Sequence, residues 1–347
     1  NKTFTHTWGD AYCSTDLAAY DFMFSTVYET PFVVDETTTV LPIALTFRPL
    51  MARIGMKLAL GANETPKYVT FTTDDNVLPT AGTVNADGTF SASALTNSLT
   101  VETDRKEFTV GLLPVGVASK MSVHVTTTDG MTYSDKSFQL AGLKRNTHYT
   151  MNVPCRTKRF MLTVPDGVNS KYGTGTYGDN GFFQVEPQYD PESIFDGWHF
   201  LRSEIKSDKD AADGDVLKNR NRIQLQAVSL GTNRAQNGAF VTPPIQCDGT
   251  KTVTVSFTAA TNKLTVGSVQ YRIGVTNNGA DISENFLRSF DNIQSSLEGE
   301  CPWKHSGSVS RTHTFTVTNG QRIMMKVYSS GGGTPCHLEL ADFTYTV

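Results

Sequence analysis

Apolar and polar residues alternate along much of the chain, and this period of two is typical of β-strands buried on one face. The alternation is clearest in residues 119–133, 252–259, 312–328 and 337–347. Threonine, valine and phenylalanine fill these runs, and such residues suit the pleated surface of a sheet. The pattern therefore predicts an all-β protein.

Pairs of turn-forming residues separate the predicted strands. Asp-Gly occurs at residues 87–88 and 129–130, and Asn-Gly occurs at residues 319–320. Such pairs tolerate the positive φ angles of the tight turns that join adjacent antiparallel strands. We therefore expect a β-hairpin at each of the three positions.

Helical patterns are scarce. Within residues 283–297, Phe286, Phe290 and Ile293 recur at a spacing of three to four, which predicts a short helix. We expect this helix to pack over the edge of a sheet rather than to bind a partner. Residues 204–222 are charged and almost free of apolar side chains, so they are predicted to form a solvated loop.

Length and a break in the pattern predict two domains. The 347 residues exceed the roughly 100–200 that one domain usually holds. A predicted strand ends at Val153, Pro154 interrupts the pattern, and a new apolar run begins at Phe160. We therefore expect one domain over residues 1–155 and a second over residues 156–347.

Charge and hydropathy exclude several kinds of partner. The formal net charge is -4 and no run of lysine or arginine occurs, so the sequence does not predict a nucleic-acid partner. No stretch approaches the roughly 20 apolar residues of a membrane-spanning helix, so the chain is not predicted to be an integral membrane protein. The chain begins at Asn1 rather than at methionine, from which we expect that an export leader has been removed.

No catalytic or zinc-binding motif stands out in the sequence. The five cysteines are scattered without a Cys-x-x-Cys pair, and neither His-Glu-x-x-His nor Gly-x-Ser-x-Gly occurs. Because the number of cysteines is odd, at least one thiol is expected to be free. Cys301 and Cys336 form either a disulfide or two buried free thiols. We therefore predict a protein that is not an enzyme.

Three aromatic residues are candidates for contact with a sugar, because an aromatic ring can stack on the apolar face of a pyranose. Trp303 lies in a predicted loop beside Pro302, where its ring would be accessible. Trp198 and Tyr271 are the other two candidates. For Trp198, a place in the hydrophobic core is the favoured alternative, because an aromatic residue that opens a strand usually packs inward.

Four segments in the first half of the chain share their order with one family of surface proteins. They are YDFMFSTVYET at 20–30, LTFRPLMARIGMKLAL at 45–60, FTVGLLPV at 108–115 and VHVTTTDGMTYSDKSFQLAGLKRNTHYTMNV at 123–153. Together they resemble the fimbrillin-like domains of Bacteroides and Porphyromonas. One departure is Arg48-Pro49, where the family usually has a histidine, so the local turn is expected to differ.

The resemblance implies a transthyretin-like or Ig-like sandwich in the first domain. It also implies lipoprotein export, a lipid anchor, display on the outer membrane at the cell surface, and a role in adhesion or pilus building. Other fimbrial subunits are then the implied partners, joined by exchange of a β-strand. Because the second half does not repeat the four motifs, a fimbrial tip or accessory subunit is favoured over a stalk subunit.

The second half resembles a different fold. Residues 238–259 and 339–347 resemble the opening and closing strands of a galactose-binding-like jelly roll. This resemblance implies a second β-sandwich and an alternative function, namely a carbohydrate-binding surface lipoprotein that recognises a host or dietary glycan.

Jelly rolls of this kind often hold a structural calcium ion, which requires six to eight oxygen ligands. Asp342, with Asp190 or Glu192, is the candidate set of ligands, and the alternative is a solvated acid at a strand edge. Apart from this calcium ion, no cofactor is expected.

Overall fold

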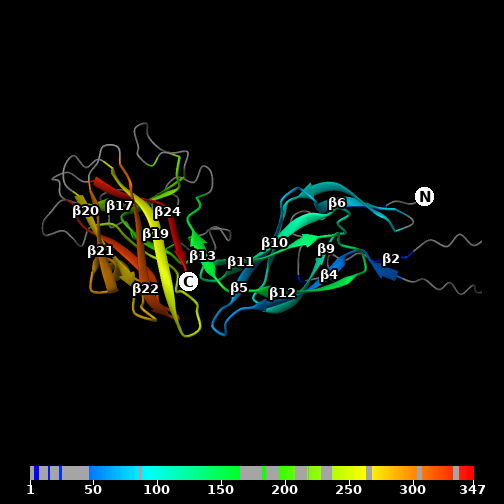
Figure 1. The fold of residues 1–347 in the computed structure, drawn as a ribbon, viewed down its shortest axis with the longest axis horizontal. Coiled ribbons are helices and arrows are strands. Elements are labelled where there is room, and N and C mark those ends of the chain that lie inside the picture. Colours follow the sequence, from blue (N-terminus) through cyan, green and yellow to red (C-terminus); the bar gives the residue numbers. More distant parts are fainter. Residues whose placement is uncertain are drawn as a thin grey trace, which may run out of the picture. The chain divides into compact units, whose positions relative to one another are not determined.

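The computed structural model describes residues 4–7, 15, 23–25, 47–85, 88–164, 182–184, 195–207, 217, 219–227, 237–262, 268–302, 307–330 and 336–347. Over these residues the protein is all-β apart from one short helix, as the alternation predicts (Figure 1). No helix in this part of the chain is long and apolar enough to cross a membrane.

The chain divides into two compact units. Unit 1 comprises Asn1–Leu60, Thr65–Thr127 and Thr132–Arg156. Unit 2 comprises Gly61–Glu64, Thr128–Met131 and Thr157–Val347. Two short loops from the first half of the sequence therefore belong to unit 2.

Unit 1 is a β-sandwich with two main sheets. The first sheet is antiparallel and contains, in order, β11 (Thr132–Leu140), β10 (Ser119–Thr127), β5 (Pro66–Thr73) and β8 (Ser98–Glu102). The second contains β12 (His148–Pro154), β4 (Ala52–Ala59) and β9 (Glu107–Leu112), with β12 parallel to β4. Smaller sheets are formed by β1 (Phe4–Thr7), β6 (Leu78–Val84) and β7 (Phe90–Thr96), and by β2 (Met23–Ser25) and β3 (Phe47–Pro49).

The core of unit 1 lies between its two main sheets. Ile54, Met56 and Leu58 of β4 are buried at alternate positions, and they belong to the same cluster as Phe71 of β5 and Val123 of β10. Alternation of this kind buries one face of each strand and leaves the other face in solvent. The pattern of the sequence therefore determines which face of each strand points inward.

Unit 2 is a jelly-roll-like sandwich of two antiparallel sheets. In the first sheet β24 (Cys336–Thr346) has β19 (Thr250–Asn262) on one side, and β19 also pairs with β22 (Val309–Thr318). On its other side β24 pairs with β17 (Arg222–Ala227), itself next to β16 (Ser203–Lys206), and with β13 (Lys158–Met161). The second sheet contains, in order, β14 (Phe182–Gln184), β15 (His199–Leu201), β18 (Ala239–Val241), β23 (Ile323–Ser330), β20 (Ser268–Val275) and β21 (Gln294–Pro302).

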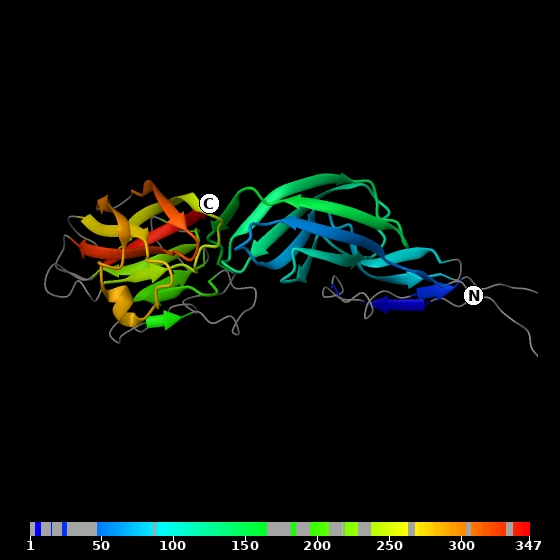
Figure 2. The same cartoon turned by 90° about the horizontal axis from the view of Figure 1, so that it is seen from below.

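The helix predicted over residues 283–297 is shorter in the structure. Helix α2 (Glu284–Arg288) begins after Ser283, whose side-chain oxygen accepts a hydrogen bond from the Phe286 N–H at 3.2 Å. Leu287 packs on Leu201 and neighbouring residues of the second sheet of unit 2. Figure 2 shows the short helix lying against this sheet. The helix thus covers the face of strands β15 and β18 rather than an edge. Residues 294–302 form β21 instead, because they pair with β20.

Two of the three expected hairpins are confirmed. Strands β6 and β7 form one, although residues 86–87 of its turn lie outside the described part, and β10 and β11 form the other, with Gly130 at φ +76°. The expectation for residues 319–320 is wrong, because β22 and β23 lie in different sheets. Gly320, at φ +87°, turns the chain from one sheet of unit 2 to the other. The predicted loop over 204–222 is also partly wrong, since its first residues belong to β16 and pair with β17.

Candidate functional site

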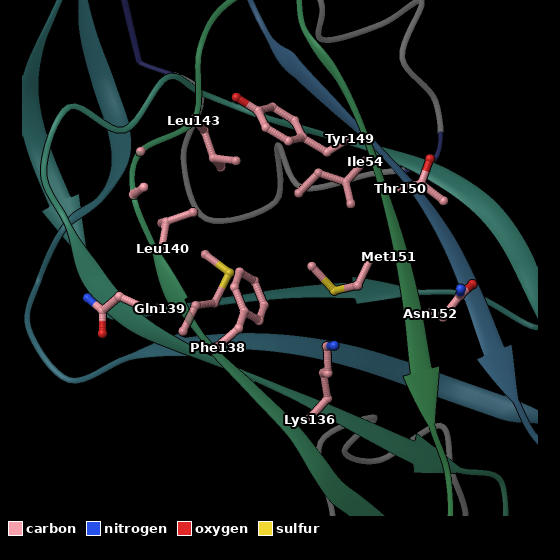
Figure 3. A pocket seen from close by; sticks show the side chains of 13 residues that line it. Ile54, Lys136, Phe138, Gln139, Leu140, Leu143, Tyr149, Thr150, Met151 and Asn152 are labelled. Atoms are coloured by element: carbon pink, nitrogen blue, oxygen red, sulfur yellow. The ribbon is translucent and has the colours of Figure 1, made fainter.

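Unit 1 carries an apolar groove between β11 and β12, shown in Figure 3. Its volume is about 550 Å³. Phe138 and Leu140 extend from β11, and Tyr149 and Met151 extend from β12 toward them, with Ile54 of β4 between the two strands. Apolar side chains from three strands therefore converge on one hollow.

The groove is apolar because its lining residues occupy the inward positions of alternating strands. On β12, Tyr149 and Met151 are half-buried, whereas the neighbours His148 and Thr150 are exposed. Phe138, Tyr149 and Met151 pack against the core of unit 1 without being fully covered. Incompletely covered apolar surface of this kind marks an interaction site more often than an isolated exposed residue does.

Strand β12 also has a free edge. Among the described residues it pairs with β4 on one side and with no strand on the other. Such an edge presents unpaired backbone N–H and C=O groups, which can hydrogen-bond to an added strand. Lys136 and Asn152 lie at one end of the groove and give that end a polar character. The arrangement offers main-chain pairing beside apolar pockets.

Unit 2 has a different hollow, on the outer face of strands β13, β24, β19 and β22. Its volume is about 420 Å³. Hydroxyl groups of Ser256, Thr312 and Thr344 line it, together with Arg159 and Asp342. Ser256 and Thr312 are hydrogen-bonded through their hydroxyl oxygens at 3.1 Å. This second hollow is polar, in contrast to the apolar groove of unit 1.

The structure places Trp198 and Tyr271 in the core of unit 2, where both are 0% exposed. Trp198 stacks on Phe200 with 5.7 Å between ring centroids, and the Tyr271 hydroxyl lies 3.1 Å from Nε2 of His313. Burial raises the pKa of Tyr271 to about 12. Neither ring is presented to a ligand, because both point between the sheets. Trp303 lies outside the described residues.

Asp342 lies in β24, and its carboxylate forms an ion pair with the guanidinium of Arg220. The other two candidate calcium ligands, Asp190 and Glu192, lie outside the described residues. Within the described ranges, no group of three or more histidine, cysteine or carboxylate side chains could hold a metal ion. The positive charge of Arg220 beside Asp342 does not favour the binding of a calcium ion there. The calcium site stays a prediction.

Cys301 is a free, buried thiol, so it does not form the disulfide considered with Cys336. Burial raises its pKa to about 11, which keeps the thiol protonated at neutral pH. Cys247 is likewise free and buried. These cysteines therefore act as small apolar side chains in unit 2.

Sequence reasoning missed both hollows. Phe138 and Met151 look like ordinary inward residues of two strands, and their meeting depends on which strands are neighbours in space. The sequence does contain a signal for the polar hollow of unit 2, because threonine and serine occupy alternate positions in residues 250–258 and 310–318. What the sequence does not reveal is that these two runs pair with each other in register.

Comparison with known proteins places the groove within a recognised family segment. A family model described as fimbrillin-like matches residues 1–166. This segment of the chain is therefore similar to fimbrillin-like proteins. The fimbrillin-like segment contains every residue of the groove in unit 1, since the lining extends from Ile54 to Asn152.

Several solved structures are similar to part of the chain. A candidate cell adhesion protein from Bacteroides uniformis is 16% identical with a TM-score of 0.33, and the match covers 44% of this chain and 60% of that one. A candidate cell adhesion protein from Bacteroides ovatus is 20% identical with a TM-score of 0.29, covering 44% and 54%. A family 35 carbohydrate-binding module from Clostridium thermocellum is 10% identical with a TM-score of 0.25, covering 43% and 91%.

The match thus spans little more than half the length of the two adhesion-type structures. Among curated proteins, none matches the chain.

Proposed function

We propose that the chain is a non-enzymatic cell-surface adhesion protein, a fimbrial tip or accessory subunit that takes up a β-strand from another fimbrial subunit. The observation that carries this proposal is the apolar groove beside the free edge of β12. The groove lies within the fimbrillin-like segment, which supports a role in adhesion.

Strand uptake follows from two properties of the groove. A strand added along residues 148–154 hydrogen-bonds to the free edge of β12, and its alternate side chains enter the groove. Burying three large apolar side chains there contributes roughly 5–9 kcal/mol before the cost of ordering the strand is subtracted. Main-chain pairing alone would accept many sequences, so the apolar pockets give the preference for an alternating apolar strand.

A charge placed in the groove tests the proposal. Phe138→Glu puts a carboxylate among the lining residues, whereas Ser137→Glu puts the same group on the exposed side of the same strand. Immunogold microscopy of the native host should find wild type and Ser137→Glu on surface filaments, and Phe138→Glu absent from them. Thermal unfolding of both purified variants checks that they fold. Equal incorporation of a folded Phe138→Glu variant, or wild-type protein found only away from filaments, would overturn the proposal.

Anchoring belongs to the same proposal. A fimbrial accessory subunit has to be held at the outer membrane, and we place it on the extracellular face through a lipid anchor. Metabolic labelling with a fatty acid and protease treatment of intact cells test the two parts separately. An unlabelled protein argues against the anchor, and full protection from protease argues against surface exposure.

A second candidate function is glycan binding by unit 2, as a surface lipoprotein for host or dietary carbohydrate. The polar hollow on the outer face of β13, β24, β19 and β22 favours it, because clustered hydroxyl and charged groups can hydrogen-bond to sugars. A glycan array with the full chain tests this function, and Trp303→Ala tests the predicted part of Trp303 in it. An array without a reproducible signal would count against glycan binding.

A further inference from the structure

The outer face of the first sheet of unit 2 carries two adjacent rows of mostly polar side chains. Cross-strand register places Met161, Thr344, Ser256 and Thr312 in one row, and Arg159, Thr346, Thr254 and Thr314 in the next. Residues between these positions, such as Phe160, Val255 and Tyr345, are buried in the core. The hydroxyl groups therefore all face solvent together.

A β-bulge brings a carboxylate onto this face. Opposite Phe257 of β19, strand β24 contributes two residues, Asp342 and Phe343, because Ser256 pairs with Thr344 and Thr258 with Ala341. Asp342 has φ +50°, a left-handed conformation that is uncommon in a strand. Phe343 remains in the core, whereas the Asp342 side chain is 57% exposed. The extra residue thus aims the carboxylate outward at the hollow.

Arg220 holds this carboxylate in place. Its Nη2 group pairs with Oδ2 of Asp342 and also donates to Oγ1 of Thr258 at 3.1 Å. Strained backbone conformations concentrate at binding sites, where surrounding contacts maintain them. The pair leaves the second carboxylate oxygen of Asp342 available to accept a hydrogen bond from a ligand hydroxyl.

Arg159 provides a positive charge at the other end of the hollow. Its side chain is exposed, and none of the described carboxylates forms an ion pair with it. Arg159 pairs in register with Thr346, four positions from Asp342, which corresponds to about 13 Å along the strand. The exposed side chain of Met161, 56% accessible, lies between them as an apolar surface.

We infer that this hollow binds an acidic oligosaccharide, with Arg159 pairing with its anionic group and Asp342 accepting hydrogen bonds from its hydroxyls. The inference rests on the proposed glycan-binding function and assigns its site and charge preference. An arginine guanidinium matches a carboxylate or a sulfate through two parallel hydrogen bonds. The serine and threonine hydroxyls can both donate to and accept from sugar hydroxyls.

Calorimetric titration of the full chain tests the inference with three probes. They are an oligogalacturonide, its neutral methyl ester and a sulfated oligosaccharide of similar length. We expect at least one acidic probe to bind about tenfold or more tightly than the ester, and salt to weaken that binding. The comparison between the two acidic probes shows whether the anionic group is a carboxylate or a sulfate.

Variants locate the site. Arg159→Ala should remove the preference for the acidic probe, and Asp342→Asn should weaken binding of acidic and neutral probes alike. Arg105→Ala, which removes an exposed arginine from unit 1, is the matched control and should leave binding unchanged. Both substitutions in the hollow are at exposed side chains, so the fold is expected to persist.

The outcomes separate the inference from the function on which it rests. If the ester binds as tightly as the acidic probes, or if Arg159→Ala changes nothing, the assigned site is wrong while glycan binding stands. If none of the three probes binds, the inference is overturned, and the glycan array decides the broader function independently.

Discussion

Nζ of Lys158 lies 2.6 Å from Oδ2 of Asp129 in the interior of unit 2, and Oε1 of Glu64 lies 2.9 Å from the same nitrogen. The side chains are 2%, 1% and 7% exposed, respectively. The carbonyl of Gln246 accepts a third hydrogen bond from Lys158, so all three donors of the ammonium group are used. Asp129 also accepts from the backbone N–H of Gln246 at 3.0 Å. One buried cation is thus shared by two buried carboxylates and a carbonyl oxygen.

Removing the cation should destabilise unit 2 strongly. Lys158→Met keeps much of the side-chain volume but leaves the Asp129 and Glu64 carboxylates buried without their cation, which costs about 3–5 kcal/mol. Lys57→Met is the matched control, because it breaks the exposed ion pair with Glu107 and should leave the free energy of unfolding almost unchanged. Denaturant unfolding followed by tryptophan fluorescence measures both. If Lys158→Met lowers the free energy of unfolding no more than the control does, the expectation is contradicted.

The stability of unit 2 should also depend on its two loops from the first half of the sequence. A fragment starting at residue 157 lacks Glu64 and Asp129, so Lys158 would have neither carboxylate. We expect this fragment to unfold at lower denaturant concentration than unit 2 within the full chain. Lys158→Met in the fragment should recover part of the loss, since an apolar side chain needs no partner. If Lys158→Met does not stabilise the fragment, the missing carboxylates are not the cause of its lower stability.

The sequence predicted where strands occur better than it predicted which strands pair with each other, and the reason is physical. Alternation reports that one face of a strand is buried, and so β10, β19 and β24 were recognisable. It does not report pairing, which explains why Asn319-Gly320 looked like a hairpin although β22 and β23 occupy different sheets. The groove at Phe138 and the bulge at Asp342 depend on pairing, so neither could be predicted.

Lys326 should make the stability of unit 2 depend on pH. Its side chain is buried, and Nζ donates to the carbonyl of Asn237 at 3.0 Å and lies 5.2 Å from the ring centre of Phe290. Burial, with smaller effects of Arg288 and Arg202, lowers its pKa to about 7 from a usual value of 10.5. Between these two values the unfolded chain binds more protons than the folded one, so this group makes stability rise as pH increases.

The measurement is the free energy of unfolding from about pH 7 to about pH 10. Lys326→Met should flatten the rise contributed by this group and should be neutral or stabilising near pH 7. Lys251→Met, at an exposed position of β19, is the control and should leave the profile unchanged. If Lys326→Met and the control give the same slope, Lys326 is not the titrating group.

Trp198 should contribute to the stability of unit 2 through packing in its core rather than to the binding of a ligand. Its ring is fully buried and lies 5.1 Å from Phe160, 5.4 Å from Phe195 and 5.5 Å from Phe240, measured between centroids. Trp198→Ala removes this packing and leaves a cavity, which should cost about 3–5 kcal/mol, whereas Trp198→Phe fills part of the space and should cost less. Denaturant unfolding followed by circular dichroism measures the order of stability, because the fluorescence probe itself is removed. If Trp198→Phe proved as stable as wild type but lost binding to a glycan that wild type binds, the ring would be a ligand contact after all.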